Sequence, residues 1–175
     1  MSADGSTVAW STWCADGTSL ALGVSVWRPS AGVVTTTAGG GSMGWYRPVV
    51  SGDGQVVAAA AFDSFTVVGN RVGRLDTASG SVIGSVATPG GSTVAGVDVA
   101  GDRAILSNLG GPANLVDLAT GQLTAVAAAP PAGTNLIVTA TSPSLQYVTI
   151  LTSTTDGRQA LDRVEVASHA RRRMQ

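Results

Sequence analysis

Residues that could carry out chemistry are few and scattered in this chain. The sequence has one histidine, His169, and one cysteine, Cys14. A zinc site would need carboxylate ligands beside them, and the acidic residues occur singly rather than in a cluster. The run Gly39-Gly40-Gly41 lacks the Gly-Lys-Ser/Thr ending of a phosphate-binding loop. We therefore expect no catalytic residue, no metal, no cofactor and no enzyme activity of the chain's own.

The remaining polar candidates fit structural roles. Five aspartates fall in Gly-rich or Ser-rich turns, where a carboxylate can accept hydrogen bonds from nearby backbone N–H groups; they are Asp16, Asp53, Asp76, Asp102 and Asp117. His169 stands at a turn position. Arg171–Arg173 belong to a basic tail, residues 170–175, which we expect to be solvated.

Composition indicates an all-β protein that does not bind nucleic acid. Hydrophobic residues make up 44% of the chain and charged residues 12%, and Glu165 is the only glutamate. A net charge of -1 gives no field that would attract nucleic acid. No apolar stretch approaches the roughly 18 residues of a membrane span. Met1–Gly5 shows no basic start to a secretory signal, so we expect a cytoplasmic protein by default.

Two turn patterns recur at intervals of about 45 residues, the length of a four-stranded propeller blade. The first is a turn followed by an apolar strand, with anchors at Asp16, Asp53, Asp102 and Ser144. The second is a strand end, an acid, three residues and a glycine, as in Leu75-Asp76 to Gly80 and Val116-Asp117 to Gly121. Weaker copies end at Gly32 and His169. The first turn would join strands A and B of a blade, and the second would join strands C and D.

The patterns divide the chain into blades over residues 1–38, 39–88, 89–129 and 130–169. In the first blade we expect strand A at Thr7–Thr12, with strands B and C compressed into Ser19–Trp27. The fourth blade looks incomplete, because the basic tail occupies the place of its strand D. Either the chain closes as a four-blade ring with a defective last blade, or it forms an open arc. We favour the arc, a part of a longer propeller, because the spare strand needed for closure is missing.

The layout resembles the degenerate WD-repeat-like propellers of bacteria. The best copies are Ser142-Pro143-Ser144-Leu145-Gln146-Tyr147-Val148 and the two acid-to-glycine turns, and the resemblance spans nearly the whole chain. The sequence lacks the Gly-His and Trp-Asp pairs of true WD repeats. The resemblance implies that ligands meet the face bearing the D–A and B–C loops. Candidate binding residues in or beside those loops are Trp45, Tyr46, Arg47, Asp63, Phe65, Asn70, Asn108 and Asn135.

Three functions fit the sequence. The first is a non-catalytic binding or scaffold module that holds a protein partner, or another copy of itself, by the loop face or the open blade edges. The second is the propeller part of a larger peptidase, glycosidase or quinone-dependent dehydrogenase whose active residues lie elsewhere. The third is part of a membrane-anchored sensor.

Overall fold

The computed structural model describes residues 1–15, 20–37, 43–63, 70–108 and 110–174, and all regular elements in these ranges are strands. They form four antiparallel sheets in which each strand pairs with its neighbours in the sequence. The first sheet holds β1 (Val8–Ala15), β2 (Leu20–Arg28) and β3 (Gly32–Thr37), and the second β4 (Met43–Val50), β5 (Val56–Asp63), β6 (Arg71–Asp76) and β7 (Val82–Ala87). The third holds β8 (Ser92–Val97), β9 (Arg103–Asn108), β10 (Ala113–Asp117) and β11 (Leu123–Ala127), and the fourth β12 (Thr134–Thr141), β13 (Tyr147–Thr154), β14 (Gln159–Glu165) and β15 (Arg171–Arg173).

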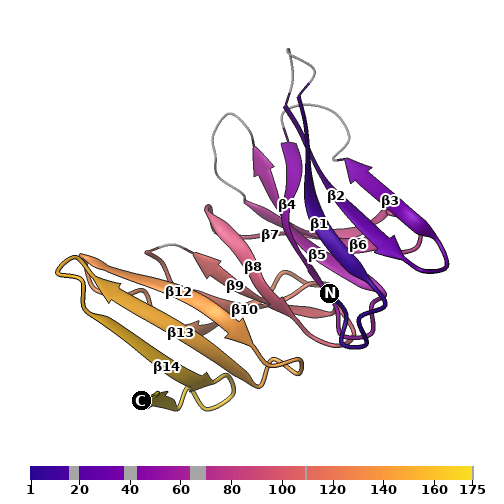
Figure 1. The fold of residues 1–175 in the computed structure, drawn as a ribbon. Coiled ribbons are helices and arrows are strands. Elements are labelled where there is room, and N and C mark those ends of the chain that lie inside the picture. The colour runs from indigo at the N-terminus through magenta and orange to yellow at the C-terminus, as the bar shows by residue number, and fades with distance from the viewer. Residues whose placement is uncertain (16–19, 38–42, 64–69, 109, 175) are drawn as a thin grey trace.

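The four sheets stack in chain order as an open arc. The first sheet contacts the second through β1 and β2 against β4, the second contacts the third mainly through β4 and β5 against β8, and the third contacts the fourth through β12. Figure 1 shows the first and fourth sheets at opposite ends of the molecule. Three apolar clusters fill the joints between successive sheets. The predicted all-β, open propeller-type array is confirmed. The part of the chain that the structure describes contains no helix long and apolar enough to cross a membrane.

One turn occurs four times with the same hydrogen bond. The closing N–H to C=O bonds run from Ser2 to Thr7 (2.9 Å), Ser51 to Val56 (2.8 Å), Asp98 to Arg103 (3.0 Å) and Ser142 to Tyr147 (2.9 Å). The fourth residue of each turn has a positive φ; these residues are Gly5, Gly54, Gly101 and Leu145. In the last three sheets this turn joins the first strand to the second. In the first sheet this turn is followed by β1, the first described strand.

Strand β1 therefore occupies the second-strand position, that of β5, β9 and β13. The strand registers agree, because the partners Val8 and Trp27 match Val57 and Leu75. Ser11 of β1 also accepts the backbone N–H of Arg47 at 3.1 Å, as Ser107 of β9 accepts that of Val138 at 3.2 Å. The prediction that Thr7–Thr12 forms strand A is wrong. Ser2–Thr7 is the type of turn that leads into a second strand, so the strand after it is not the first of its sheet. Among the described residues, the first sheet has three strands and none of them corresponds to β4, β8 and β12.

The second predicted turn is confirmed at two places. The Oδ1 atom of Asp76 accepts the N–H groups of Ala78 (3.1 Å) and Ser79 (2.7 Å). Hydrogen bonds from Ser79, first from its hydroxyl and then from its backbone, lower the pKa of the Asp76 carboxyl. Asp117 binds Ala119 and Thr120 in the same way.

Asp53 and Asp102 have different roles in the first type of turn. Asp53 accepts the hydroxyl of Ser51 at 2.6 Å and the N–H of Gln55 at 3.0 Å, as predicted for a turn aspartate. In the third sheet the turn is instead stabilised by Asp98, whose carboxylate accepts the N–H groups of Asp102 and Arg103. The Asp102 carboxylate instead pairs with Arg74 at 3.0 Å. Asp16 lies outside the described residues.

The predicted basic tail is partly a strand, which corrects the expectation of an incomplete fourth blade. Arg171–Arg173 form β15, which pairs with β14. Asp162 of β14 explains how three adjacent arginines can do so, because its carboxylate is only 2% exposed and pairs with two of them. The Nε atoms of Arg171 and Arg173 lie 2.8 Å and 2.6 Å from its oxygens.

Candidate functional site: two open sheet faces and a cavity

The predicted loop-face residues do not form one site. Trp45 is only 7% exposed and packs in the joint between the first two sheets. Its ring lies against Gly73, where even a methyl group would collide with it. Trp45 is therefore a core residue rather than an exposed contact.

Tyr46 and Arg47 lie within β4. The strand register shifts between Tyr46 and Val49, and Arg47 takes a φ of 50° there. Its exposed guanidinium stands 5.4 Å from the centre of the Tyr46 ring. The pair marks a bulge in the inner strand.

The three candidate asparagines lie at one end of three different sheets. Asn70 precedes β6, Asn108 ends β9 and Asn135 lies near the start of β12. Asn108 donates from Nδ2 to the carbonyl of Gly90 at 2.9 Å, so its amide supports a loop. Asn135 is exposed. Phe65 lies outside the described residues, and Asp63 is described only as the last residue of β5.

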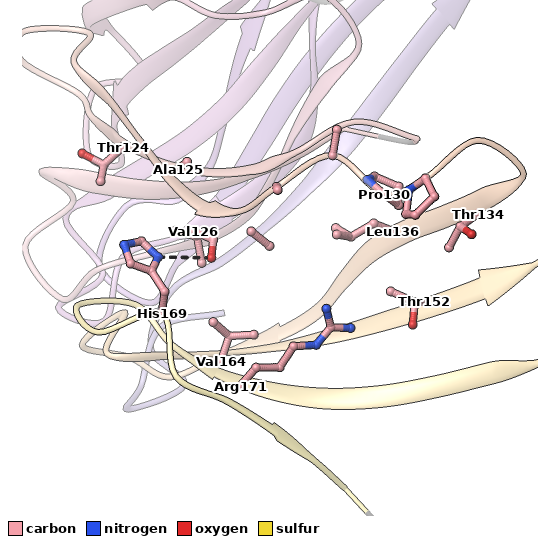
Figure 2. A pocket seen from close by; sticks show the side chains of 14 residues that line it. Thr124, Ala125, Val126, Pro130, Thr134, Leu136, Thr152, Val164, His169 and Arg171 are labelled. Carbon is pink, nitrogen blue, oxygen red and sulfur yellow. Dashed lines mark hydrogen bonds between the residues drawn. The ribbon is translucent and has the colours of Figure 1, made fainter.

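A cavity of about 780 Å³ opens between β11 and the fourth sheet. Figure 2 shows His169 and Arg171 on the side formed by the fourth sheet, facing the chain that carries Val126 and Pro130. The rest of the lining is mainly apolar and includes Ala127, Leu136 and Val164. A cavity of this size could hold a small molecule.

The two basic side chains of this cavity are already engaged with the protein. His169 Nδ1 lies 3.4 Å from the carbonyl oxygen of Val126. Arg171 is held by Asp162. Burial raises the pKa of the Asp162 carboxyl, but hydrogen bonds from Arg171 and Arg173 outweigh it, so the pKa lies below its usual value. The cavity is therefore mainly apolar, and the charge of its arginine, Arg171, is neutralised by Asp162.

One catalytic-type pattern was missed at the sequence level. Gly40-Gly41-Ser42-Met43-Gly44 fits the Gly-x-Ser-x-Gly sequence of a hydrolase nucleophile. That motif works at a turn from a strand into a helix. Here Met43 and Gly44 begin strand β4, and Ser42 itself is outside the described residues. Within the described ranges no group of three His, Cys, Asp or Glu residues could hold a metal ion.

The outer face of the first sheet carries exposed tryptophans; we call it the N-terminal face, formed by Val8, Trp10, Ser25, Trp27 and Val33. Trp10 and Trp27 are each 40% exposed. Ala9, Val24 and Val26 point the other way into the joint with the second sheet. Residues at the positions of Trp10 and Trp27 in the other sheets are at most 2% exposed: Ala59, Leu106 and Ile150 for Trp10, and Leu75, Val116 and Val164 for Trp27.

The outer face of the fourth sheet is open in the same way; we call it the C-terminal face, formed by Ile137, Thr149, Leu151, Leu161 and Arg163. Ile137, Leu151 and Leu161 are paired across three neighbouring strands. Leu161 is 36% exposed, whereas the residues at its position in the other sheets are 0% exposed: Val24, Val72 and Ala113. Arg163 lies over the Tyr147 ring at 4.8 Å and borders this apolar row.

Comparison with known proteins supports the fold and leaves the family open. No family model and no curated protein matches the sequence. Hydrazine synthase of Kuenenia stuttgartiensis has a similar structure, with a TM-score of 0.60 and 15% identity over 99% of this chain and 47% of that chain. A prolyl endopeptidase gives 0.65 and 13% over 96% of this chain and 29% of that one.

The β-propeller domain of the trilobed protease of Pyrococcus furiosus, reported to have an open velcro topology, gives a TM-score of 0.59 and 11% identity over 98% of this chain and 54% of that chain. The chain thus has the fold of a propeller portion and spans roughly half or less of these structures. Membership of a WD-repeat-like family remains a prediction.

Proposed function

We propose that this chain is a non-catalytic propeller module that binds protein through its N-terminal and C-terminal faces. The observation that carries the proposal is the exposure of Trp10, Trp27 and Leu161 at positions that are buried in every other sheet. Each is a large apolar residue, and burying one contributes about 1.5–3 kcal/mol. The two faces are therefore suited to a further sheet of the same kind.

The N-terminal and C-terminal faces are also suited to pack against each other. At each joint, the earlier sheet contributes the side equivalent to the C-terminal face. The next sheet contributes the side equivalent to the N-terminal face. A second copy can therefore meet the C-terminal face with its own N-terminal face. Self-association is the measurable form of the proposed binding.

Solution mass by light scattering tests this proposal. We expect a mass above 17.4 kDa that rises with protein concentration. Leu161→Thr and Trp10→Thr should each return the mass toward the monomer, because each removes apolar surface from one face. Ile83→Thr is the matched control, since Ile83 is 52% exposed but lies on β7 of the second sheet. A monodisperse monomer at every concentration, with the wild-type sequence, would overturn the proposal.

The alternative is the propeller portion of a larger enzyme or of a membrane-anchored sensor. The hydrazine synthase and prolyl endopeptidase similarities favour the enzyme, because this chain covers only 47% and 29% of those chains. Peptidase, glycosidase and quinone-dependent dehydrogenase activities are the candidates. Flanking reading frames that continue the 45-residue period, or that carry a catalytic domain, would support this alternative.

A further inference from the structure

The joint between the third and fourth sheets contains the cavity of about 780 Å³ and differs from the joint before it. Residues 88–91 connect the second sheet to the third, whereas residues 128–133 connect the third to the fourth and form a connection two residues longer. The first four residues of this longer connection line the cavity. Both walls and the loop come from residues 124–171, so the cavity is separate from the two open faces.

His169 shows that this joint is wider at its rim than the two joints before it. It occupies the turn position of Gly80 and Gly121 in the second and third sheets, and like them it has a positive φ. A Cβ atom at Gly80 would lie 2.7 Å from Val34 of the preceding sheet, and one at Gly121 would lie 3.4 Å from Val86. The joint with the cavity instead accommodates a whole imidazole ring (Figure 2), although a left-handed φ is unfavourable for a residue with a Cβ atom.

The charges around the cavity favour an anion. Arg171 lines it, and no acidic side chain does so among the described residues. Asp162 binds Nε and Nη2 of Arg171, whereas Nη1 makes no hydrogen bond within the described part of the chain. Asp162 neutralises Arg171 but also pairs with Arg173, so the three side chains together carry one surplus positive charge. The cavity thus offers one hydrogen-bond donor and a surplus positive charge beside apolar walls.

We propose that this cavity binds a small monocarboxylic acid with an apolar body. The carboxylate accepts a hydrogen bond from Arg171 Nη1 and balances the surplus positive charge. The apolar body lies against Val126, Leu136 and Val164. Cavities of roughly 300–1,000 Å³ with apolar walls and few polar groups are typical of small-molecule sites. A peptide segment is a poorer occupant, because these walls would leave its backbone N–H and C=O groups without partners.

Octanoate is the probe, and 1-octanol is its matched uncharged control. In an NMR titration of the full chain, octanoate should bind saturably and shift the methyl signals of Val126, Leu136 and Val164. Octanol should bind about tenfold more weakly, because it lacks the charge that strengthens the hydrogen bond to the guanidinium. Arg171→Gln should remove this difference between the two probes. Arg172→Gln should retain it, because Arg172 does not line the cavity.

Filling the cavity tests the site independently of its charge. Ala127→Leu should block octanoate, because Ala127 lines the cavity, whereas Ala132→Leu on the exposed part of the loop should not. All titrations use the Leu161→Thr background, so that self-association through the C-terminal face does not contribute. Absence of octanoate binding, equal binding of octanol, or binding that survives in a folded Ala127→Leu variant would overturn this proposal and leave the proposed protein binding untouched.

Discussion

The two sides of the fourth sheet are built from the same strands but have different surroundings. On the inner side, Val148 and Ile150 of β13 are at most 1% exposed and pack against the third sheet. On the outer side, Leu151 of the same strand is half-buried, and its partner Leu161 is 36% exposed. Burial in this protein therefore depends on whether a neighbouring sheet is present. Substitutions on the two sides of this sheet should therefore differ in their cost to stability.

The largest effect is expected from truncating an isoleucine in a joint. Ile105 is 0% exposed between the third and fourth sheets, so Ile105→Ala should lower the free energy of unfolding by about 3 kcal/mol through lost burial and a cavity. Ile137→Ala, at a 39% exposed position on the C-terminal face, should cost less than about 1 kcal/mol. Urea unfolding of the two variants measures the difference. Equal losses would show that the outer face is already packed.

The next effect concerns the charge buried on the inner side of the fourth sheet. Asp162→Asn should cost about 2 kcal/mol, because it weakens hydrogen bonds from two arginines to a carboxylate that is 2% exposed. Since the folded pKa of Asp162 is lowered, its contribution is present above the unfolded pKa of about 4 and is lost as pH falls through the folded value.

Unfolding measured between pH 7 and pH 2 should therefore converge for the wild type and Asp162→Asn in acid. Arg172→Gln is the control, because Arg172 pairs in register with Arg163 rather than with Asp162. A constant difference at all pH values would contradict the proposed role of the carboxylate.

A smaller effect is expected at Gly73, which occupies in β6 the position that Asp162 occupies in β14. Gly73→Ala should cost about 1.5 kcal/mol, because the new methyl group meets the Trp45 ring inside a joint. Gly84→Ala in neighbouring β7 meets nothing within 4 Å and should be nearly neutral. Thermal unfolding of both variants tests whether the tight contact lies in the joint.

The smallest effect is local to the N-terminal turn. Hydrogen bonds from the Ser2 hydroxyl and then from the backbone and hydroxyl of Ser6 lower the pKa of Asp4 from 3.8 to about 2. Ser2→Ala should raise this pKa toward the ordinary value, as followed by an NMR titration of the carboxyl carbon. An unchanged pKa in the variant would argue against the turn that assigns β1 to the second-strand position.

The sequence predicted the sheets better than it predicted their ends. Asp76 to Gly80 and Asp117 to Gly121 were recognisable because an acid and a positive-φ glycine have strong local preferences. The turn at Ser2–Thr7 was missed because the later turn at Asp16 was taken as the first copy of that pattern. Arg171–Arg173 were misassigned because the stabilising partner, Asp162, belongs to another strand and such pairing is not visible in a local pattern.

The candidate site was less predictable than the fold. Trp45 was a candidate contact beside a loop, with core packing as the alternative, and its burial depends on Gly73, which is distant in sequence and offers space for the ring. The exposure of Trp10 and Trp27 could not be recognised from their type, because identical positions in the other sheets are buried. Whether such a residue is accessible depends on the number of stacked sheets, which a single repeat does not encode.

Sequential pairing within each sheet also has a kinetic consequence. Within a sheet each strand pairs with the next along the chain, so each hairpin closes only a short loop and loses little chain entropy before its contacts form. Sheet formation can then begin in any repeat and spread by docking of neighbours, as in other repeat proteins. The sheets of this chain should therefore form independently of one another, and the joints between them should pack last.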